Sequence, residues 1–419
     1  MTPFLSHLLT WTIAGAATAG VITRPFRWPE AVWALGGAFL LVGLGLLPLA
    51  DGLRAVGKGT DVYLFLVGMM LLSETARREG LFDVAAARAV NLAGGSSGRL
   101  FLLIYGVGTL VTVFLSNDAT AVVLTPAVYA AARHAKADPL PHLFACALIA
   151  NAASFVLPIS NPANLVLYGD HLPPLIDWLK RFAPPSLLAV GVTFAALRWA
   201  ERRSLSGACA SGVEQPRLSA GGWSVLVGIG VTAGALLTVS ALGRPLGLAT
   251  FILGALTTFA VLVRGRSSPW PILRGVSWGV LPLVAGLFVL VEALGHSGVI
   301  AALADALRHA AAVSPTGAGA WAGGLVAVSG NLMNNLPAGL VASATLNQAH
   351  APGVVVDAML IGVDLGPNLS ITGSLATILW LAAIRREGEA VGFWRFFKVG
   401  VVVMPPALIA SLGARLWLG

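Results

Sequence analysis

Residues 112–126, TVFLSNDATAVVLTP, and residues 330–344, GNLMNNLPAGLVASA, decide the fold, because each places polar side chains in the middle of an apolar stretch. The 419-residue chain around them is 57% hydrophobic and only 11% charged. Soluble domains carry about 25% charged residues. Apolar runs of roughly 20 residues match the hydrocarbon thickness of a bilayer. We therefore expect an all-α, polytopic membrane protein.

The apolar runs predict ten full or broken spans and two re-entrant hairpins. The spans fall at residues 8–23, 30–49, 61–76, 142–169, 182–200, 221–241, 247–263, 276–296, 354–384 and 395–417, and the hairpins at 100–136 and 317–349. The long polar stretch 201–219 reads as a cytoplasmic linker between two halves. We expect scaffold spans at 1–60 and 220–275, a first repeat at 61–200 and a second at 276–419.

The basic residues predict the orientation. Placing both termini outside leaves 19 of the 26 Lys and Arg residues inside, which agrees with the positive-inside rule. Seven remain outside: Arg54, Lys58, Lys180, Arg181, Arg244, Arg308 and Arg415. The formal charge of +8 therefore reflects topology, and we expect a bacterial inner-membrane protein that contacts lipid and no nucleic acid.

Four matches at one offset of 218 residues indicate an internal repeat. They pair Gly68, Glu74, Gly80 and Asn117 with Gly286, Glu292, Gly298 and Asn335. The first unit begins outside and the second inside, so the repeat is predicted to be inverted. Transporters of that kind bind their substrates near the midplane, where broken helices of the two repeats meet.

The two polar clusters are expected to be hairpin tips. About ten apolar residues precede Asn334, enough to reach the middle of the bilayer, and Pro337 suits the first turn of a returning helix. In the first unit, Leu100–Leu115 could nearly cross the membrane, and the charge parity is the same for a turn at the far surface. A mid-membrane turn is favoured because Ser116-Asn117-Asp118 is short and is followed directly by apolar residues. Arms at 81–98 and 299–312 are amphipathic and are expected to lie at the membrane interface.

A second broken segment follows each hairpin, with Pro and Gly at its centre, at residues 158–164 and 364–374. Unwound backbone in a membrane is tolerated where it lines a cavity. Amide and hydroxyl side chains there suit a small polar solute, although Ser and Asn also cap helices in ordinary packing. The candidate substrate-binding residues are Ser116, Asn117, Asp118, Ser160, Asn161, Asn164, Asn334, Asn335, Gly366, Asn368, Thr372 and Ser374.

Asp118 is the leading candidate for proton coupling or cation coordination, because an intramembrane carboxylate is costly. Asp364 is the second candidate, although it could simply cap the Gly366-Pro367 break. Glu74 and Glu292 lie near predicted helix ends, where a structural pairing is favoured. The six histidines near loops are expected to be solvated: His134, His142, His171, His296, His309 and His350.

Only Cys146 and Cys209 are present, so we expect neither a disulfide framework nor a clustered metal site. The chain shows no phosphate-binding loop, and we expect no cofactor. An ion gradient or a separate subunit must then supply the energy. The scattered histidines offer no nucleophile–base pair or metal cluster, which disfavours an enzyme. A passive channel remains an alternative.

Several motifs resemble the arsenical pump membrane protein family of the ion transporter superfamily. They are Leu115–Ala119 with Leu124-Thr125-Pro126, Ser160-Asn161, Asn334–Pro337 and Asp364–Trp380. The resemblance, from about Val62 to the C-terminus, implies two hairpin-containing repeats, elevator-like motion and a homodimer. It also implies arsenite and antimonite efflux driven by protons, and some members pair with a cytoplasmic ATPase.

Two cysteines cannot form the three-thiolate site that trivalent arsenic prefers. Arsenite would therefore pass as the neutral trihydroxide, held by oxygen and nitrogen groups. Pro162-Ala163-Asn164 is closer to carboxylate carriers of the superfamily, and the Asn-Asp tip is shared with cation/proton antiporters. A carboxylate carrier and a sodium/proton antiporter therefore stay open as alternatives.

Overall fold

The computed structural model describes residues 2–169, 172–210, 212–214 and 216–418 and is helical throughout. His171 lies outside the described residues. The first half contains α1 (Pro3–Thr23), α2 (Glu30–Gly43), α3 (Leu49–Lys58), α4 (Thr60–Arg78), α5 (Leu81–Ala93), α6 (Ser97–Leu115), α7 (Asn117–Ala119), the π-helical turn η2 (Thr120–Leu124), α8 (Thr125–His134), α9 (Pro139–Ala152), η3 (Pro158–Ser160), α10 (Pro162–Tyr168) and α11 (Leu175–Ala200).

The second half repeats this order. It contains α12 (Ala220–Ala241), α13 (Gly247–Gly265), α14 (Trp270–Gly275), α15 (Val280–His296), α16 (Val299–Val313), α17 (Pro315–Met333), α18 (Asn335–Ala349), α19 (Gly353–Leu365), η6 (Gly366–Leu369), α20 (Leu375–Arg386) and α21 (Phe393–Trp417). Between the halves, η5 (Ser204–Ser206) is the one helical turn in the described part of the linker.

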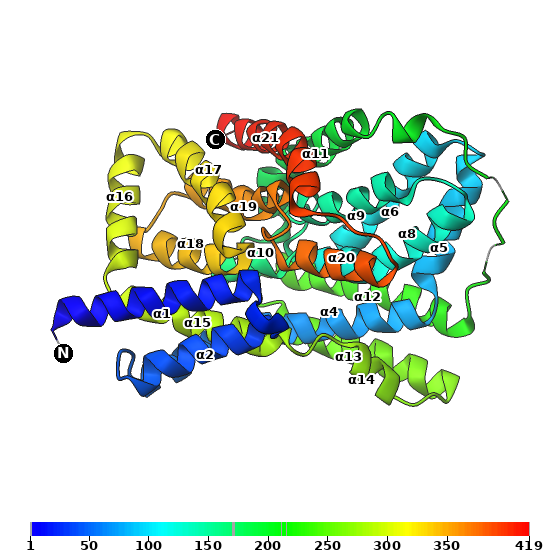
Figure 1. The fold of residues 1–419 in the computed structure, drawn as a ribbon. Coiled ribbons are helices and arrows are strands. Elements are labelled where there is room, and N and C mark those ends of the chain that lie inside the picture. The colour runs from blue at the N-terminus through cyan, green and yellow to red at the C-terminus, as the bar shows by residue number, and fades with distance from the viewer. Residues whose placement is uncertain (1, 170–171, 211, 215, 419) are drawn as a thin grey trace.

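The structural repeat is longer than the sequence matches indicated. α6 and α17 begin and end 218 residues apart, and α11 and α21 begin 218 residues apart. α1 and α12 also correspond, as do α2 and α13. α1 and α12 run in opposite directions, and the arms α5 and α16 stand at opposite ends of the molecule (Figure 1). These placements are those of an inverted repeat.

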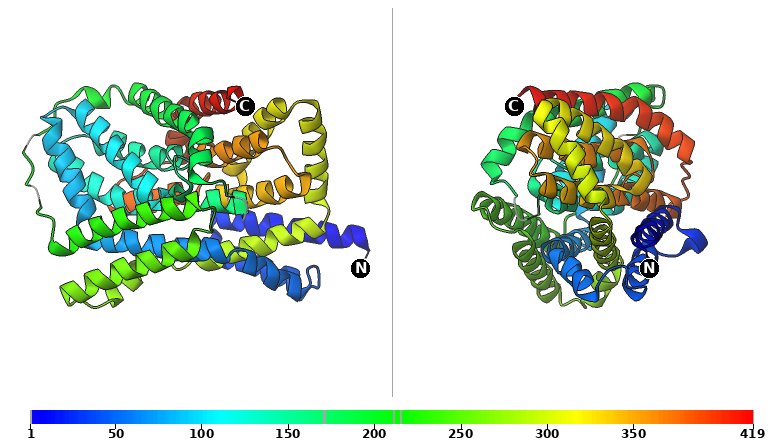
Figure 2. Two further views of the ribbon diagram at one scale, coloured as in Figure 1. Left: turned by 180° about the vertical axis from the view of Figure 1, so that it is seen from behind. Right: turned by 90° about the vertical axis from the view of Figure 1, so that its left-hand side faces the viewer.

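The helices form two layers (Figures 1 and 2). We call the layer of α1, α2, α4, α12, α13 and α15 the lower layer, and the layer of hairpins, broken helices, α11 and α21 the upper layer. α4 packs on α13, and its counterpart α15 packs on α2. In the upper layer, α11 lies along α21.

The repeated glycine motif has a packing role. A Cβ on Gly68 would collide with the backbone at Thr250 of α13, and a Cβ on Gly286 would collide with Ala34 of α2. Gly80 and Gly298 have φ values of 74° and 82° and follow the ends of α4 and α15. Glycine adopts this conformation without the penalty of a side chain, so both motif ends are accounted for by the fold.

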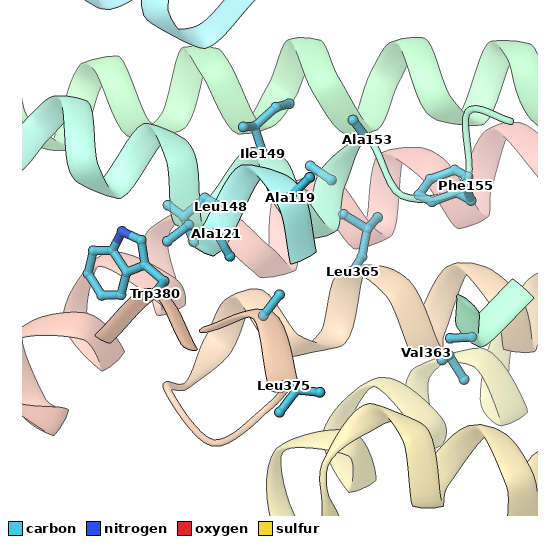
Figure 3. Close-up of a cluster of buried hydrophobic side chains, with 14 of the residues drawn as sticks. Ala119, Ala121, Leu148, Ile149, Ala153, Phe155, Val363, Leu365, Leu375 and Trp380 are labelled. Carbon is cyan, nitrogen blue, oxygen red and sulfur yellow. The ribbon is translucent and has the colours of Figure 1, made fainter. Parts of the chain in front are cut away.

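The core of the upper layer is built by both repeats around the breaks. Ala119 and Ala121 after the first tip lie near Leu148 of α9 and near Leu365 and Trp380 of the second repeat (Figure 3). The Trp380 indole donates a hydrogen bond to the Leu143 carbonyl at 2.9 Å. The repeats therefore interlock at the level of the broken segments.

Six described helices are long and apolar enough to cross a membrane, or up to eight if two bent pairs are each one span. One pair is α15 and α16, bent by 74°. α6 and α17 have 19 residues each, about 28 Å at about 1.5 Å per residue. The first arm of the second hairpin, α17, is therefore longer than the ten apolar residues expected. Its length alone does not show how deep in the membrane the hairpin tip lies.

Candidate functional site

Both hairpins turn at a strained residue. Ser116 has φ 113° and ψ 161°, and Asn334, 218 positions later, has φ 75° and ψ 152°. This region is almost confined to glycine and costs about 1–3 kcal/mol for other residues. The next residues, Asn117 and Asn335, begin new helices. The predicted tips are thus present, and the repeat places the same unusual backbone at each.

A new helix begins at each tip, and a side chain at the tip accepts a hydrogen bond from one of the first backbone N–H groups of that helix. The Asn334 carboxamide oxygen accepts from the backbone N–H of Leu336 at 3.3 Å. In the first tip, the Asn117 carboxamide oxygen accepts from the Asp118 N–H at 2.9 Å. A π-helical turn, Thr120–Leu124, follows at once. Such turns are rare and occur frequently at functional sites, and nothing in the residue pattern predicted this one.

Each tip is bound to the break of its own repeat. The Asn335 backbone N–H donates to the Gly373 carbonyl at 2.8 Å. Asn331, one turn earlier, donates to the Gly366 carbonyl at 2.9 Å and accepts from the Ser370 hydroxyl at 2.8 Å. In the first repeat, the Ser160 hydroxyl donates to the Val113 carbonyl at 3.0 Å.

The two breaks are also joined across the repeats. The Asn161 amide donates to Asp364 Oδ1 at 2.7 Å, and its own oxygen caps α10 through the Ala163 N–H at 3.0 Å. Asn151 donates to Asn368 Oδ1 at 3.0 Å, and Asn368 donates in turn to the Leu148 carbonyl at 3.0 Å. Buried hydrogen bonds between side chains of this kind fix one arrangement of the segments.

Two connected hollows reach the first tip. A cleft of ≈ 60 Å³ between the layers runs from Glu74 and Ser277 to Ser116 and Asp118. A smaller cavity of ≈ 10 Å³ continues inward, and Asp118 lines both. The smaller cavity is lined by Leu66, Asn117, Asp118, Asn161, Pro162, Val280, Asn335, Leu336, Leu375 and Ala376. It can hold about one water molecule, so the structure shows a nearly closed site with one open side.

Five predicted site residues line these hollows: Ser116, Asn117, Asp118, Asn161 and Asn335. The other predicted residues make internal contacts instead. Asn164 donates to the Ser154 carbonyl at 2.8 Å, and Ser374 caps α20. Five more predicted site residues also lie outside the linings of both hollows: Ser160, Asn334, Gly366, Asn368 and Thr372.

The site carries carboxylates and no cations. Among the described residues that line the two hollows, there is neither a Lys nor an Arg. Asp364 is fully buried behind Asn161, and among the described residues its Oδ2 has no hydrogen-bond partner. The described part of the chain contains no cluster of three metal-ligating side chains. This donor set suits a small uncharged hydroxyl-bearing solute together with one transferable proton.

Three further polar residues were not predicted to belong here. Asn331 and Asn151 form hydrogen bonds to the broken segments of the second repeat. The only feature of the sequence that points to them is an amide side chain within an apolar helix. Glu74 lines the outer cleft, where it pairs with Arg77 at 2.6 Å and Arg78 at 2.9 Å. Its counterpart Glu292 pairs with Lys58 at 2.7 Å. Both glutamates are thus paired, but Glu74 pairs within α4 and Glu292 pairs with α3, not with an arm or loop.

The chain is similar in sequence to several bacterial membrane transporters. An arsenical pump membrane protein of Yersinia enterocolitica is 29% identical over 364 residues, covering 83% of this chain and 84% of that protein. One from Escherichia coli is 27% identical over 397 residues, covering 90% and 91%. An uncharacterized transporter of Mycobacterium tuberculosis is 26% identical over 406 residues, covering 92% of each chain.

Among solved structures, the YdaH transporter of Alcanivorax borkumensis superposes with a TM-score of 0.57 at 15% identity, covering 88% of this chain and 87% of that one. This likeness supports the fold of broken and re-entrant helices. The sequence profile described as "Citrate transporter" matches residues 18–363. The chain is therefore a multi-pass secondary transporter, not an enzyme, and it belongs to the citrate transporter (CitMHS) family.

Proposed function

We propose that this transporter exports arsenite and antimonite as neutral trihydroxides in exchange for protons. The observation that carries the proposal is the lining of the inner cavity, which offers the amides of Asn117, Asn161 and Asn335 beside a single carboxylate, Asp118. Amides donate and accept hydrogen bonds without a fixed charge. They can therefore hold hydroxyl groups weakly enough for release on the far side, in a state of the carrier whose inner cavity is wider than the ≈ 10 Å³ seen here.

A substrate with several carboxylates fits this lining less well. Buried anions need paired cations, and no described residue of either lining supplies one. A carboxylate carrier is nevertheless the second candidate, because the family profile is described as a citrate transporter and the N-termini of α7 and α18 begin at the cavity. Helix N-termini offer N–H groups to anions.

Arsenic recognition by thiolates is disfavoured by the two cysteines. Cys146 is buried in α9, whereas Cys209 lies in the linker. Neither lines the hollows at the tips. The relatives named arsenical pump membrane proteins support arsenite as the cargo. Oxygen and nitrogen groups then carry the recognition.

Proton coupling is assigned to Asp118, with Asp364 as the second carboxylate. Asp118 faces the open cleft and the inner cavity, so protons and substrate can reach it from the same side. Asp364 lies behind it, bonded to Asn161. Competition between a proton and the bound trihydroxide at Asp118 would prevent the two from crossing together. The exchange is obligatory because, in this proposal, the empty site with an ionised Asp118 does not cross either.

The proposed motion carries the upper layer past the lower layer. The cleft separates α4 and α15 of the lower layer from the tip at Asp118 and from α10 and α20. The arms α5 and α16 connect the layers at opposite ends (Figure 1). We propose a homodimer held through the lower layer, which would stay fixed during transport. A cytoplasmic ATPase subunit belongs to the same proposal as an accessory partner.

Uptake into inside-out vesicles tests the cargo. Arsenite, antimonite, citrate and sodium are offered separately, with and without a proton gradient that is acidic inside. We expect accumulation of arsenite and antimonite only with the gradient. Accumulation of citrate or sodium with no arsenite would refute the proposal and favour the corresponding alternative. Flux that ignores the gradient would indicate a channel.

A carboxylate comparison tests the assigned coupling residue. Asp118→Asn is expected to abolish accumulation, since the amide cannot carry the proton. Asp177→Asn is the matched control, because Asp177 of α11 is half-buried away from the hollows and, among the described residues, its carboxylate pairs with Lys180 at 3.4 Å. Equal loss in both variants would contradict the assignment.

A further inference from the structure

Two wide hollows lie beside the start of α11 and the end of α21, away from the hairpin tips. One of ≈ 520 Å³ is lined by Lys180, Arg181, Arg415, Leu418 and the start of α19. A second, of ≈ 440 Å³, shares Arg181 and Gly353 with the first and adds Tyr168 and His350. Neither lining contains a carboxylate among the described residues. α11 and α21 lie side by side along the upper edge of the molecule (Figure 1).

The cations around these hollows are held in place by a buried carboxylate. Asp357 of α19 is fully buried, and Arg415 donates to its Oδ2 from two nitrogens at 2.8 and 2.6 Å. Arg181 approaches Oδ1 at 3.6 Å, and the Tyr168 hydroxyl also contacts it. One carboxylate thus faces two guanidinium groups, whereas the nearby Lys180 is paired with Asp177 at 3.4 Å. A net positive charge is left facing the hollow.

The backbone adds donors to the same place. Pro352, Gly353 and Val354 line the larger hollow at the start of α19, a helix of 13 residues. The first N–H groups of a helix lack intrahelical partners and favour anions. Guanidinium groups bind the oxygens of a phosphate with two parallel hydrogen bonds. The lining therefore combines the groups that recognise a phosphate.

The fold does not require these charges. The repeat pairs Arg415 with Leu197 at an offset of 218, and it pairs Asp357 with Leu143, since α9 begins 214 residues before α19. Both leucines are fully buried. The corresponding place in the first repeat is thus packed with apolar side chains. Arg415 and Asp357 therefore place charges at one end of the molecule only, although the counterpart of Lys180 at the same offset, Lys398, is also a lysine.

The position of the hollow suits a lipid headgroup. Trp417 and Leu418 at the end of α21 are 88% and 50% exposed, and Ile176 at the start of α11 is 66% exposed. Tryptophan is enriched where a bilayer meets water. Three of the seven cations that the charge count places outside gather here, although the positive-inside rule disfavours them on that face.

We propose that the larger hollow, lined by Lys180, Arg181 and Arg415, is a phosphate-binding site distinct from the transport path. Its ligand is an anionic phospholipid headgroup or free phosphate. Arg181 and Lys180 contact the phosphate oxygens together with the first turn of α19. Arg415 holds the site in shape through Asp357. Occupancy would tie α10 and α11 of the first repeat to α19 and α21 of the second.

Native mass spectrometry of the purified full chain tests the proposal. The protein is released from nanodiscs of phosphatidylcholine with or without phosphatidylglycerol, and bound phosphatidylglycerol is counted. Arg181→Gln and Lys180→Gln are the test variants, because Arg415 still pairs Asp357 in both. Arg54→Gln is the matched control, since Arg54 is an exposed arginine that pairs with Asp51 three residues away. Inorganic phosphate is added in a separate arm.

We expect phosphatidylglycerol to be retained by the wild type and by Arg54→Gln, with about tenfold weaker binding in each test variant, as for one lost charge-assisted contact. Retention that free phosphate does not displace assigns a lipid headgroup. Phosphate binding in phosphatidylcholine alone, weakened about tenfold by Arg181→Gln, assigns a soluble ligand. Binding of neither, or equal binding by wild type and both test variants, would overturn the proposal.

Discussion

Replacing each hairpin-tip residue with glycine should stabilise the protein while impairing transport. Ser116 and Asn334 occupy backbone conformations that glycine adopts freely and other residues do not. Both side chains are nearly buried, 5% and 4% exposed, so the surrounding structure imposes the strain. A protein selected for stability alone would have glycine at both tips.

The expected magnitude follows from three terms. Relief of the strained backbone gains about 1–3 kcal/mol, and the greater freedom of glycine in the unfolded chain costs about 0.5–1 kcal/mol. The lost cap of Asn334 costs a few tenths in the glycine variant and about 1 kcal/mol in the alanine variant. Glycine should therefore raise the free energy of unfolding by about 1 kcal/mol at either tip. Alanine should lower it by about 1 kcal/mol at Asn334 and leave it nearly unchanged at Ser116, whose side chain caps no helix.

Reversible unfolding of purified protein in mixed micelles measures these free energies. Ser96→Gly is the control, because Ser96 caps α6 with an ordinary φ of −104° and glycine there relieves nothing. Substrate uptake is measured in parallel, since Ser116 lines the cleft. Glycine variants that are less stable than the alanine variants would refute the claim that the tips store strain.

Three other predictions address the breaks, the layer packing and the cysteines. Asn161→Asp removes the hydrogen bond to Asp364 and should lower the free energy of unfolding by about 1–2 kcal/mol. Adding Asp364→Asn restores a donor–acceptor pair and should recover part of that loss. A double variant no more stable than Asn161→Asp would contradict the contact between the repeats. Gly254→Ala places a methyl group against the α4 backbone and should cost about 1–3 kcal/mol by the same unfolding measurement, whereas an unchanged value would argue against close packing of the helices. Cys146→Ala with Cys209→Ser should keep arsenite uptake within twofold, and its loss would restore the case for thiolate recognition.

The broken helices were predictable because their residues conflict with a continuous span. Ser116 and Asn334 interrupt apolar sequence, and each ends a helix in the structure. At Gly366-Pro367 the helix α19 passes into the 3-10 turn η6, and the backbone becomes extended only at Ser370. The repeat was predictable only in part. α1 and α12 share no polar landmark, so their correspondence depends on helix bounds rather than on residue matches.

Side-chain direction was not predictable, because it depends on contacts between distant segments. Asn368 was expected at the cavity, yet it bonds to Asn151 and to the Leu148 carbonyl. His142 was expected to be solvated and is fully buried, with its ring nitrogen 3.0 Å from the Asp138 carbonyl. The prediction for His142 was wrong because proximity to a loop does not show which face of a helix is covered.

The central claim is that Asp118 couples proton movement to a neutral cargo. The most direct measurement records arsenite flux and internal pH together in proteoliposomes that contain purified protein. An imposed arsenite gradient should drive opposing proton movement in the wild type. Asp118→Asn should exchange arsenite between its two sides without moving protons. Proton movement that persists in Asp118→Asn, or arsenite flux without proton movement in the wild type, would contradict the account.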